Sequence, residues 1–262
     1  MVKFFKIFSL FLLLTGLVLS NCNLNHGLEP IRSNIHGVIS YSGQWPAPPE
    51  EVRLIAAKSF PPAGIEDLII GEQIPLTGDS YEYNFYLKPG VYKLVGVAWR
   101  EQNSIWDIIS ICGLYFSGTD SLSPGEITID SDTDQIDNIN ISVNRSRAHR
   151  ITNSKIIGSI TFEGAWPDSI LDLRVIATTK FSIFPFQLPT LLDISFSNSI
   201  GVGSECAQYV INAFPGDYVA TGVVMFRENS SFSFESIIAL DMTRYQVIED
   251  STVAGPNFHI RF

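Results

Sequence analysis

Hydrophobic and polar residues alternate along many short stretches of this chain, with the period of two that is typical of half-buried β-strands. Residues 35–41 show this alternation, and residues 156–162 show it again. Further strands are predicted at residues 52–57, 81–87, 92–99, 110–116, 127–129, 138–143, 173–178 and 257–262. Glycine and proline separate the segments. The pattern predicts an all-β protein with no helix longer than a few turns.

The alternating segments belong to two copies of one sequence. Residues 35–46 (IHGVISYSGQWP) return as residues 156–167 (IIGSITFEGAWP), with six of twelve positions identical at an offset of 121. A second match joins residues 83–97 to residues 209–223 at an offset of 126. Copies of about 110 residues have a common domain size. We therefore predict two tandem antiparallel β-sandwiches, repeat one (residues 35–143) and repeat two (residues 155–262), joined by a linker (residues 144–154).

Both repeats contain a Pro-Gly pair followed two residues later by tyrosine, as Pro89-Gly90 with Tyr92 and as Pro215-Gly216 with Tyr218. Proline presets φ at the second position of a turn, and glycine supplies a positive φ at the third. Each pair predicts a type II turn that joins two antiparallel strands.

The segment at residues 79–94 (DSYEYNFYLKPGVYKL) resembles the carboxypeptidase regulatory-like domain, a transthyretin-like (prealbumin-like) β-sandwich. The Gly-x-Ile-x-Tyr/Phe-x-Gly pattern at residues 37–43 and 158–164 resembles the first strand of that family. The resemblance covers both repeats and implies a fold, with accessory or spacer roles in exported proteins, but no activity. This chain departs from the family in the long segments 58–80 and 180–207, which follow the second strand of each repeat.

Residues 1–21 have the composition of a signal peptide. A basic start is followed by the apolar stretch 7–19, which is too short to span a bilayer, and then by Leu19-Ser20-Asn21-Cys22. This ending resembles a bacterial lipobox, in which the cysteine is lipidated, although Asn21 is unusual before it. Ordinary cleavage that leaves a free Cys22 is the alternative. We expect a protein exported to the bacterial cell envelope, lipid-anchored through Cys22 and followed by a tether (residues 22–34).

Charge excludes some partners. The chain carries a net charge of −10, and removal of Lys3 and Lys6 with the signal peptide gives −10 − 2 = −12. An acidic protein is not drawn to nucleic acid or anionic headgroups, so membrane attachment would depend on Cys22. Cys112 and Cys206 lie at non-equivalent places in the repeats. They are either small buried hydrophobic residues or one inter-repeat disulfide.

The two long segments are far more apolar than ordinary loops. Each predicts either a short helical turn buried at the end of a sandwich, or a contact surface for a partner or for the other repeat. The candidate contact residues are Phe60, Ile65, Leu68, Ile69, Phe181, Phe184, Phe186, Leu191 and Leu192.

Single tryptophans and acidic residues supply the remaining candidates. Trp106 has no tryptophan counterpart in repeat two, and is either a sugar-stacking platform or part of the core. Trp45 and Trp166 are expected to close the ends of the sandwiches. The acidic stretch 130–137 lacks the glycine and glutamate of an EF-hand loop, so it predicts a solvated turn and no metal site.

No motif for a nucleophile, a phosphate loop or a catalytic metal is present, so we predict no enzyme and no cofactor. A catalytic triad assembled across the fold leaves no sequence motif and stays open. The repeated charges Arg53/Arg174 and Arg100/Arg227 predict cross-strand ion pairs. The sequence favours a non-enzymatic cell-envelope lipoprotein that acts as a protein-contact or spacer module. The alternative is a carbohydrate-binding surface lipoprotein.

Overall fold

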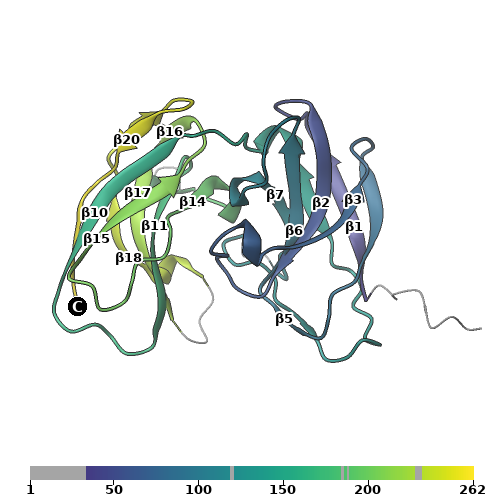
Figure 1. The fold of residues 1–262 in the computed structure, drawn as a ribbon, viewed down its shortest axis with the longest axis horizontal. Helices are drawn as coiled ribbons and strands as arrows, with labels where there is room; N and C mark the ends of the chain where they lie inside the picture. The colour runs from purple at the N-terminus through teal and green to yellow at the C-terminus, as the bar shows by residue number, and fades with distance from the viewer. Residues whose placement is uncertain (1–33, 119–120, 184–185, 188, 228–231) are drawn as a thin grey trace, which may run out of the picture. The chain divides into compact units, whose positions relative to one another are not determined.

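The computed structural model describes residues 34–118, 121–183, 186–187, 189–227 and 232–262. Within these ranges every regular element is a β-strand or a three-residue 3-10 helix, which confirms the predicted all-β fold (Figure 1). The described part of the chain holds no helix that is long and apolar enough to cross a membrane. The predicted signal peptide and Cys22 lie outside the described residues.

Repeat one forms a seven-stranded sheet in the order β3-β2-β6-β7-β9-β1-β4, and its two remaining strands, β5 and β8, pair with each other. Its strands are β1 (Ile35–Ser42), β2 (Pro49–Ala57), β3 (Ile69–Ile74), β4 (Ser80–Phe85), β5 (Gly90–Tyr92), β6 (Leu94–Glu101), β7 (Ile111–Leu114), β8 (Ile127–Ile129) and β9 (Ile141–Asn144). Its 3-10 helices are η1 (Ile65–Asp67) and η2 (Ile108–Ser110), and η3 (Arg145–Arg147) begins the linker.

Repeat two forms two four-stranded sheets. One has the order β14-β11-β17-β18, and in the other β10 pairs with β15, β20 and β21. Its strands are β10 (Lys155–Glu163), β11 (Ile170–Thr178), β12 (Ser182–Ile183), β13 (Phe186–Gln187), β14 (Ile194–Phe196), β15 (Cys206–Asn212), β16 (Gly216–Tyr218), β17 (Ala220–Arg227), β18 (Ile237–Asp241), β19 (Tyr245–Val247), β20 (Thr252–Ala254) and β21 (Phe258–Arg261). The 3-10 helices are η4 (Leu191–Asp193) and η5 (Phe234–Ser236).

The two repeats share one pattern of strand pairing. The order β3-β2-β6-β7 in repeat one matches β14-β11-β17-β18 in repeat two, and β5–β8 matches β16–β19. The pairing of β1 with β4 and β9 matches that of β10 with β15 and β21. One contact differs. In repeat one β7 also pairs with β9, so the two sheets merge into one. No such bond joins β18 to β21 in the described part of repeat two.

Three apolar clusters hold this arrangement together. One consists of residues of repeat one, with Ala148 of the linker, and includes the fully buried Trp99. A second consists of residues of repeat two and includes Tyr209 and Tyr218. The third contains buried residues of both repeats. Trp45 stacks on Trp99 in the first cluster, at 5.3 Å between ring centroids, so its predicted packing role is confirmed.

The predicted type II hairpin at the Pro-Gly pairs is wrong. The strands before and after Pro89-Gly90 do not pair with each other, because β4 pairs with β1 and β6 pairs with β2. Gly90 has a φ of +150°, whereas Gly216 is not among the residues with positive φ. The chain therefore bends here and crosses from one part of the sheet to another.

The tyrosine that follows each Pro-Gly pair fixes this crossover. Tyr92 donates its hydroxyl hydrogen to the carbonyl of Lys88 at 2.8 Å, and Tyr218 donates to the carbonyl of Phe214 at 3.1 Å. Both tyrosines are almost fully buried. The carbonyl at such a bend has no hydrogen-bond partner on a neighbouring strand. The buried phenol hydroxyl, four residues later in the chain, supplies the missing hydrogen bond. The repeated Pro-Gly-x-Tyr motif is thus a structural device in both repeats.

Candidate functional site

The third apolar cluster is an interface between equivalent faces of the two repeats. Ile55 on β2 and Ile176 on β11 hold equivalent positions at the offset of 121, and both belong to this cluster. Ala98 on β6 and Val224 on β17 are equivalent at the offset of 126, and both belong to it as well. Each repeat therefore uses the same outer sheet face against the other, as subunits do in a twofold-symmetric dimer.

This interface explains why parts of β2, β6 and β11 are buried on both faces. Residues 54–57, 94–99 and 173–178 are buried without the alternation of a half-exposed strand. Strands covered on both faces are rich in apolar residues. The apolar runs at residues 54–57 and 175–177 are therefore a sequence signal of the interface, beyond the second strand that they predict in each repeat.

The two long segments surround the interface, and each contains the predicted short helical turn, η1 or η4. Leu68 and Leu191 are buried in the shared cluster, and Phe60, Ile65 and Leu192 pack against it. The phenyl ring of Phe60 contacts two aromatic rings of repeat two, with centroid distances of 6.1 Å to Phe196 and 6.3 Å to Phe232. These candidate contact residues meet one another across the two repeats.

The remaining candidates of the long segments lie elsewhere. Ile69 is 38% exposed on β3, next to the equally exposed Ile70. Phe181 stacks on Phe234 at 6.3 Å, away from the other candidates. Phe184 and the side chain of Phe186 lie outside the described residues. The candidate contact residues whose side chains are described therefore divide into an inner group at the interface, the exposed Ile69, and Phe181, which packs on Phe234.

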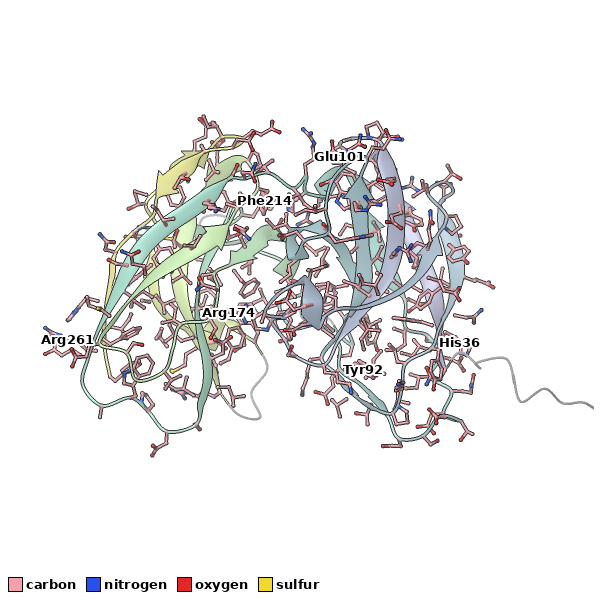
Figure 2. The ribbon with its side chains drawn as sticks, in the orientation of Figure 1. His36, Tyr92, Glu101, Arg174, Phe214 and Arg261 are labelled. Atoms are coloured by element: carbon pink, nitrogen blue, oxygen red, sulfur yellow. The ribbon has the colours of Figure 1, made fainter. Side chains whose placement is uncertain are left out.

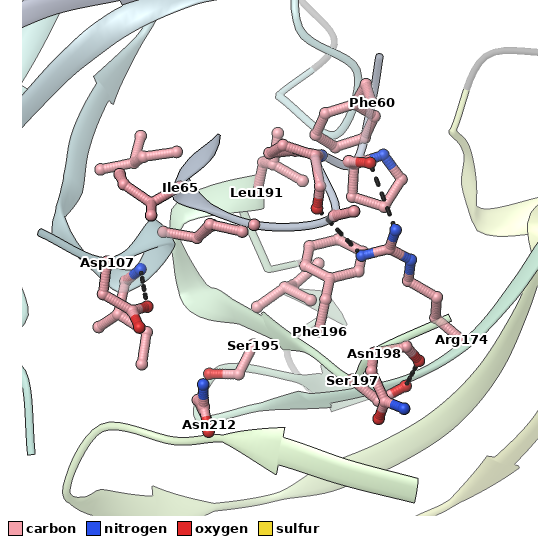
Figure 3. A pocket seen from close by; sticks show the side chains of 18 of the residues that line it. Phe60, Ile65, Asp107, Arg174, Leu191, Ser195, Phe196, Ser197, Asn198 and Asn212 are labelled. Atoms are coloured by element: carbon pink, nitrogen blue, oxygen red, sulfur yellow. Dashed lines mark hydrogen bonds between the residues drawn. The ribbon is translucent and has the colours of Figure 1, made fainter. Parts of the chain in front are cut away.

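A half-open cavity of about 550 Å³ lies within this interface. Repeat one contributes the loop of residues 60–66 and the segment around η2, and repeat two contributes β14 and one edge of β15. In Figure 3 the labelled side chains Phe60, Ile65 and Leu191 lie across the cavity from Ser195, Ser197 and Asn198. The wall is mainly apolar, and the polar groups belong mostly to repeat two.

Arg174 braces one wall of the cavity, a role that its position on a strand does not predict. Its guanidinium is 5% exposed, pairs with Asp172 at 2.6 Å, and donates to the carbonyls of Pro62 and Pro61 at 3.2 and 3.4 Å (Figures 2 and 3). Its equivalent, Arg53, pairs with Glu51 and donates to Gly71 in its own repeat. The ion pairs predicted for Arg53 and Arg174 are present, but along one strand instead of across two.

Arg100 makes the predicted cross-strand pair with Glu51, at 2.7 Å between Nη2 and Oε1. Its guanidinium carbon also lies 5.8 Å from the centroid of Trp106. Trp106 is half-buried against the shared cluster and does not line the cavity. An indole held between a core and a guanidinium does not offer the free flat face that sugar stacking needs.

The linker contributes a buried histidine to the cavity wall. His149 stacks on Phe214 at 3.5 Å between ring centroids and contacts the carbonyl of Leu192 through Nε2 at 3.2 Å. A carbonyl only accepts, so Nε2 carries the proton of the neutral ring. Burial lowers the pKa of His149 to about 4, and the hydrogen bond to Leu192 and the nearby Asp193 only partly oppose this. The ring is therefore neutral at neutral pH.

Asp193 of η4 ties the linker to the second long segment. Its carboxylate pairs with Arg147 of the linker and with Lys180 at 3.0 Å, and accepts from the backbone of Thr190 at 2.9 Å. Burial alone would raise the pKa of Asp193, but the hydrogen bonds from Arg147, Thr190 and Lys180 outweigh burial and lower the pKa to about 2. The linker, which is basic in composition, is thus part of the interface as well as a connector.

Three polar side chains that line the cavity, those of Ser197, His149 and Asp107, form hydrogen bonds within the fold. The Ser197 hydroxyl donates to the carbonyl of Asn198 at 2.7 Å and accepts from Val175 N at 2.9 Å. His149 is bonded to Leu192, and Asp107 accepts from Ile109 N at 3.0 Å as the cap of η2. These bonds leave no nucleophile–base pair among the three residues.

The acidic residues of the stretch 130–137, outside the cavity, form a hydrogen-bonded turn. Asp134 accepts hydrogen bonds from Asp130 N at 2.6 Å and from Ser131 N at 3.0 Å, which makes the acidic stretch a closed turn. Among the described residues no His, Cys, Asp and Glu side chains gather into a group suited to a metal ion.

Cys112 and Cys206 do not form a disulfide with each other. Cys112 is buried as expected, whereas Cys206 is exposed.

No family model and no curated protein matches this chain. Among solved structures, a leucine-rich repeat protein from Bacteroides thetaiotaomicron has a TM-score of 0.31 and 11% identity, covering 88% of this chain; the chain spans about a quarter, 26%, of that protein. A candidate adhesin from Bacteroides ovatus has a TM-score of 0.22 and 12% identity, covering 87% and 89% of the two chains. GBS52, the minor pilin of Streptococcus agalactiae, has a TM-score of 0.22 and 10% identity, covering 87% and 96%. Likenesses this weak support no assignment of function.

Proposed function

We propose that this chain is a non-enzymatic cell-envelope lipoprotein in which two transthyretin-like sandwiches form one stiff spacer. The observation that carries the proposal is the apolar cluster that both repeats share. Two independently mobile domains do not need a common core, whereas a spacer that holds its far end at a fixed distance does. The predicted lipid at Cys22 agrees with a place outside the cytoplasm.

The linker supports a stiff arrangement as well. His149 accepts at its backbone carbonyl from the indole of Trp99 at 3.1 Å, while its ring stacks on Phe214 of repeat two. Arg150 makes two hydrogen bonds of 2.9 Å to Glu101 of repeat one. A linker held by side chains of both repeats restricts their relative motion.

The inner group of apolar residues favours the spacer role over partner contact through the long segments. Phe60, Ile65, Leu191 and Leu192 face the other repeat, so a partner does not reach them without opening the interface. Ile69 and Ile70 remain exposed on β3 and are the part of these segments that stays available for contact. Trp106, half-buried under Arg100, gives no support to the carbohydrate-binding alternative.

Calorimetry of the mature chain tests whether the repeats act as one body. The wild type is expected to unfold in one transition, because loss of either repeat exposes the shared cluster. The Phe60→Ala/Leu191→Ala variant removes two interface side chains and is expected to separate the transition into two. Ile248→Ala, at a residue that is 61% exposed, is the control and should change nothing. Two independent transitions in the wild type would refute the stiff spacer.

Membrane attachment is tested separately by metabolic labelling with a palmitate analogue in a bacterial host. The wild type should become labelled, and the Cys22→Ala variant should not. Equal labelling of both proteins would contradict lipidation at Cys22.

A further inference from the structure

The walls of the inter-repeat cavity are held in place before any ligand arrives. Arg174 bonds the carbonyls of Pro61 and Pro62 and so fixes the loop on one side. Asp107 caps η2 on the same repeat. Across the cavity, Asp193 fixes η4 through Arg147 and Lys180. Protein interiors are close-packed, so a half-open space of about 550 Å³ with braced walls is a preformed cavity, in the size range of small-molecule sites.

The cavity offers little to a charged ligand. Arg174 is neutralised by Asp172 at 2.6 Å, and the His149 ring is neutral at neutral pH. The acids Asp107 and Glu66 line the cavity, with Glu66 exposed at the rim, so an anion would meet like charges. Desolvation of an unpaired charge against the apolar walls would add a further cost.

The uncharged polar side chains of the cavity lie on the wall that repeat two contributes. On this wall the buried Ser195 lies beside the exposed Asn212, and the exposed Asn198 lies further along, next to Ser197 (Figure 3). Amides and hydroxyls both donate and accept hydrogen bonds. The facing wall presents Phe60, Ile65 and other apolar side chains. A complementary molecule has an apolar body and one uncharged hydrogen-bonding end.

We propose that this cavity binds an uncharged, largely apolar small molecule, whose hydrogen-bonding end lies at Ser195, Asn198 and Asn212. This site is an addition to the spacer role and does not depend on it. The cavity needs both repeats, so its ligand would bind only the docked arrangement and would stabilise it by mass action.

Two neighbouring residues provide a matched test. Val210 and Ile157 face each other across β15 and β10 and are 38% and 42% exposed, but only Val210 lines the cavity. Val210→Trp narrows the cavity, whereas Ile157→Trp adds the same side chain outside it. Because both sites are on an exposed face, neither change has to fit into a core. Asn212→Trp is a second narrowing variant, should Val210→Trp fail to fold.

The probe is N-phenyl-1-naphthylamine, an uncharged aromatic amine whose fluorescence rises in apolar surroundings. The wild type and Ile157→Trp should bind one equivalent, and Val210→Trp or Asn212→Trp should bind about tenfold more weakly or not at all. The anionic 8-anilino-1-naphthalenesulfonate should bind more weakly than the uncharged probe. Absence of saturable binding, or equal binding by the folded narrowing variants, would overturn the site. Stronger binding of the anionic probe would overturn the proposed ligand chemistry.

Discussion

Repeat one and repeat two share a strand pairing pattern, but in the part of the chain that the structure describes only repeat one is closed by a strand pair at this edge, where β7 meets β9. Gly113 pairs with Val143 and Leu114 with Ser142, and the two sheets become continuous. The equivalent strand β18 pairs with β17, and Leu240, the counterpart of Leu114, is 42% exposed compared with 4%. The same fold therefore tolerates both a sealed and an open edge.

One side chain accounts for this difference. A Cβ added to Gly113 would lie 2.6 Å from Cγ2 of Val143, closer than the two strands can tolerate. Gly113 pairs with Val97, and the equivalent Val223 pairs with Ala239. Repeat two thus has the methyl group of Ala239 at the position where Gly113 leaves room for β9 in repeat one. A glycine in a strand that permits close backbone approach is a known device, and its loss in one copy opens the edge.

A second difference concerns the end of each sandwich. In repeat one the Arg145 guanidinium lies over the rings of Tyr41 and Trp45, at 4.5 and 5.9 Å from their centroids. The Tyr41 hydroxyl, the Trp45 indole N–H and the Arg145 Nε are buried, and none of them has a hydrogen-bond partner among the described residues. In repeat two, Phe162, Trp166 and Phe262 pack together at the equivalent place. Because apolar rings close this end of repeat two, the fold does not require the polar side-chain atoms that are buried at the same end of repeat one.

The largest expected effect comes from Gly113→Val compared with Ala239→Val. At Gly113 the new side chain meets β9, and overpacking of this kind should lower the free energy of unfolding by about 3 kcal/mol. At Ala239, on the half-exposed β18, the same change should stay within about 0.5 kcal/mol. Urea denaturation followed by tryptophan fluorescence measures both. Equal losses at the two positions would refute the explanation of the open edge.

The linker should make the docked repeats sensitive to acid. The pKa of His149 is about 4 in the folded state and about 6.5 when unfolded, so the unfolded chain binds the extra proton first. Stability from the neutral ring is fully present above about pH 6.5 and is lost as the pH falls toward 4, to a limit of roughly 3 kcal/mol. Asp193, with a pKa of about 2, stays ionised in this window. His149→Phe keeps the stack on Phe214 and should flatten the pH dependence of urea denaturation between pH 7 and 4.5. If the free energy of unfolding of His149→Phe depended on pH as steeply as that of the wild type, His149 would be excluded as the source of the acid sensitivity.

Exchanging residues between the two sandwich ends tests the second difference. Tyr41→Phe removes a buried hydroxyl that has no partner, and should raise the free energy of unfolding by about 1 kcal/mol. Phe162→Tyr is the reverse change at a half-buried ring, where the hydroxyl can reach water, and should cost less than about 0.5 kcal/mol. A destabilised Tyr41→Phe variant would mean that the hydroxyl has a partner, such as a bound water.

Features that depend on local chemistry are predictable from the sequence. The sequence pattern locates most strands of repeat one, and the offset of 121 aligns Ile55 with Ile176, which the fold places on equivalent faces of the shared cluster. Features that long-range contacts decide are not predictable in this way. The residues around Gly113 do not reveal that β9 lies against it. His149 and Arg174 are ordinary residues for a linker and a strand, and only the apposition of two sheet faces buries them. The bend at Gly90 has the sequence of a hairpin, because a turn motif does not specify which strands pair.

Both repeats use the tyrosine of the Pro-Gly-x-Tyr motif in the same way. Tyr92→Phe and Tyr218→Phe each remove one hydrogen bond to the carbonyl four residues earlier, at Lys88 and Phe214. A neutral hydrogen bond contributes about 1 kcal/mol, so each variant should lose about that much free energy of unfolding. Because the two tyrosines lie in separate clusters, the double variant should lose the sum. Thermal denaturation of the two single variants and the double variant checks this. A much larger loss for one tyrosine would show that the bend has a different role in that repeat, and that sequence identity within the motif does not guarantee equal use of it.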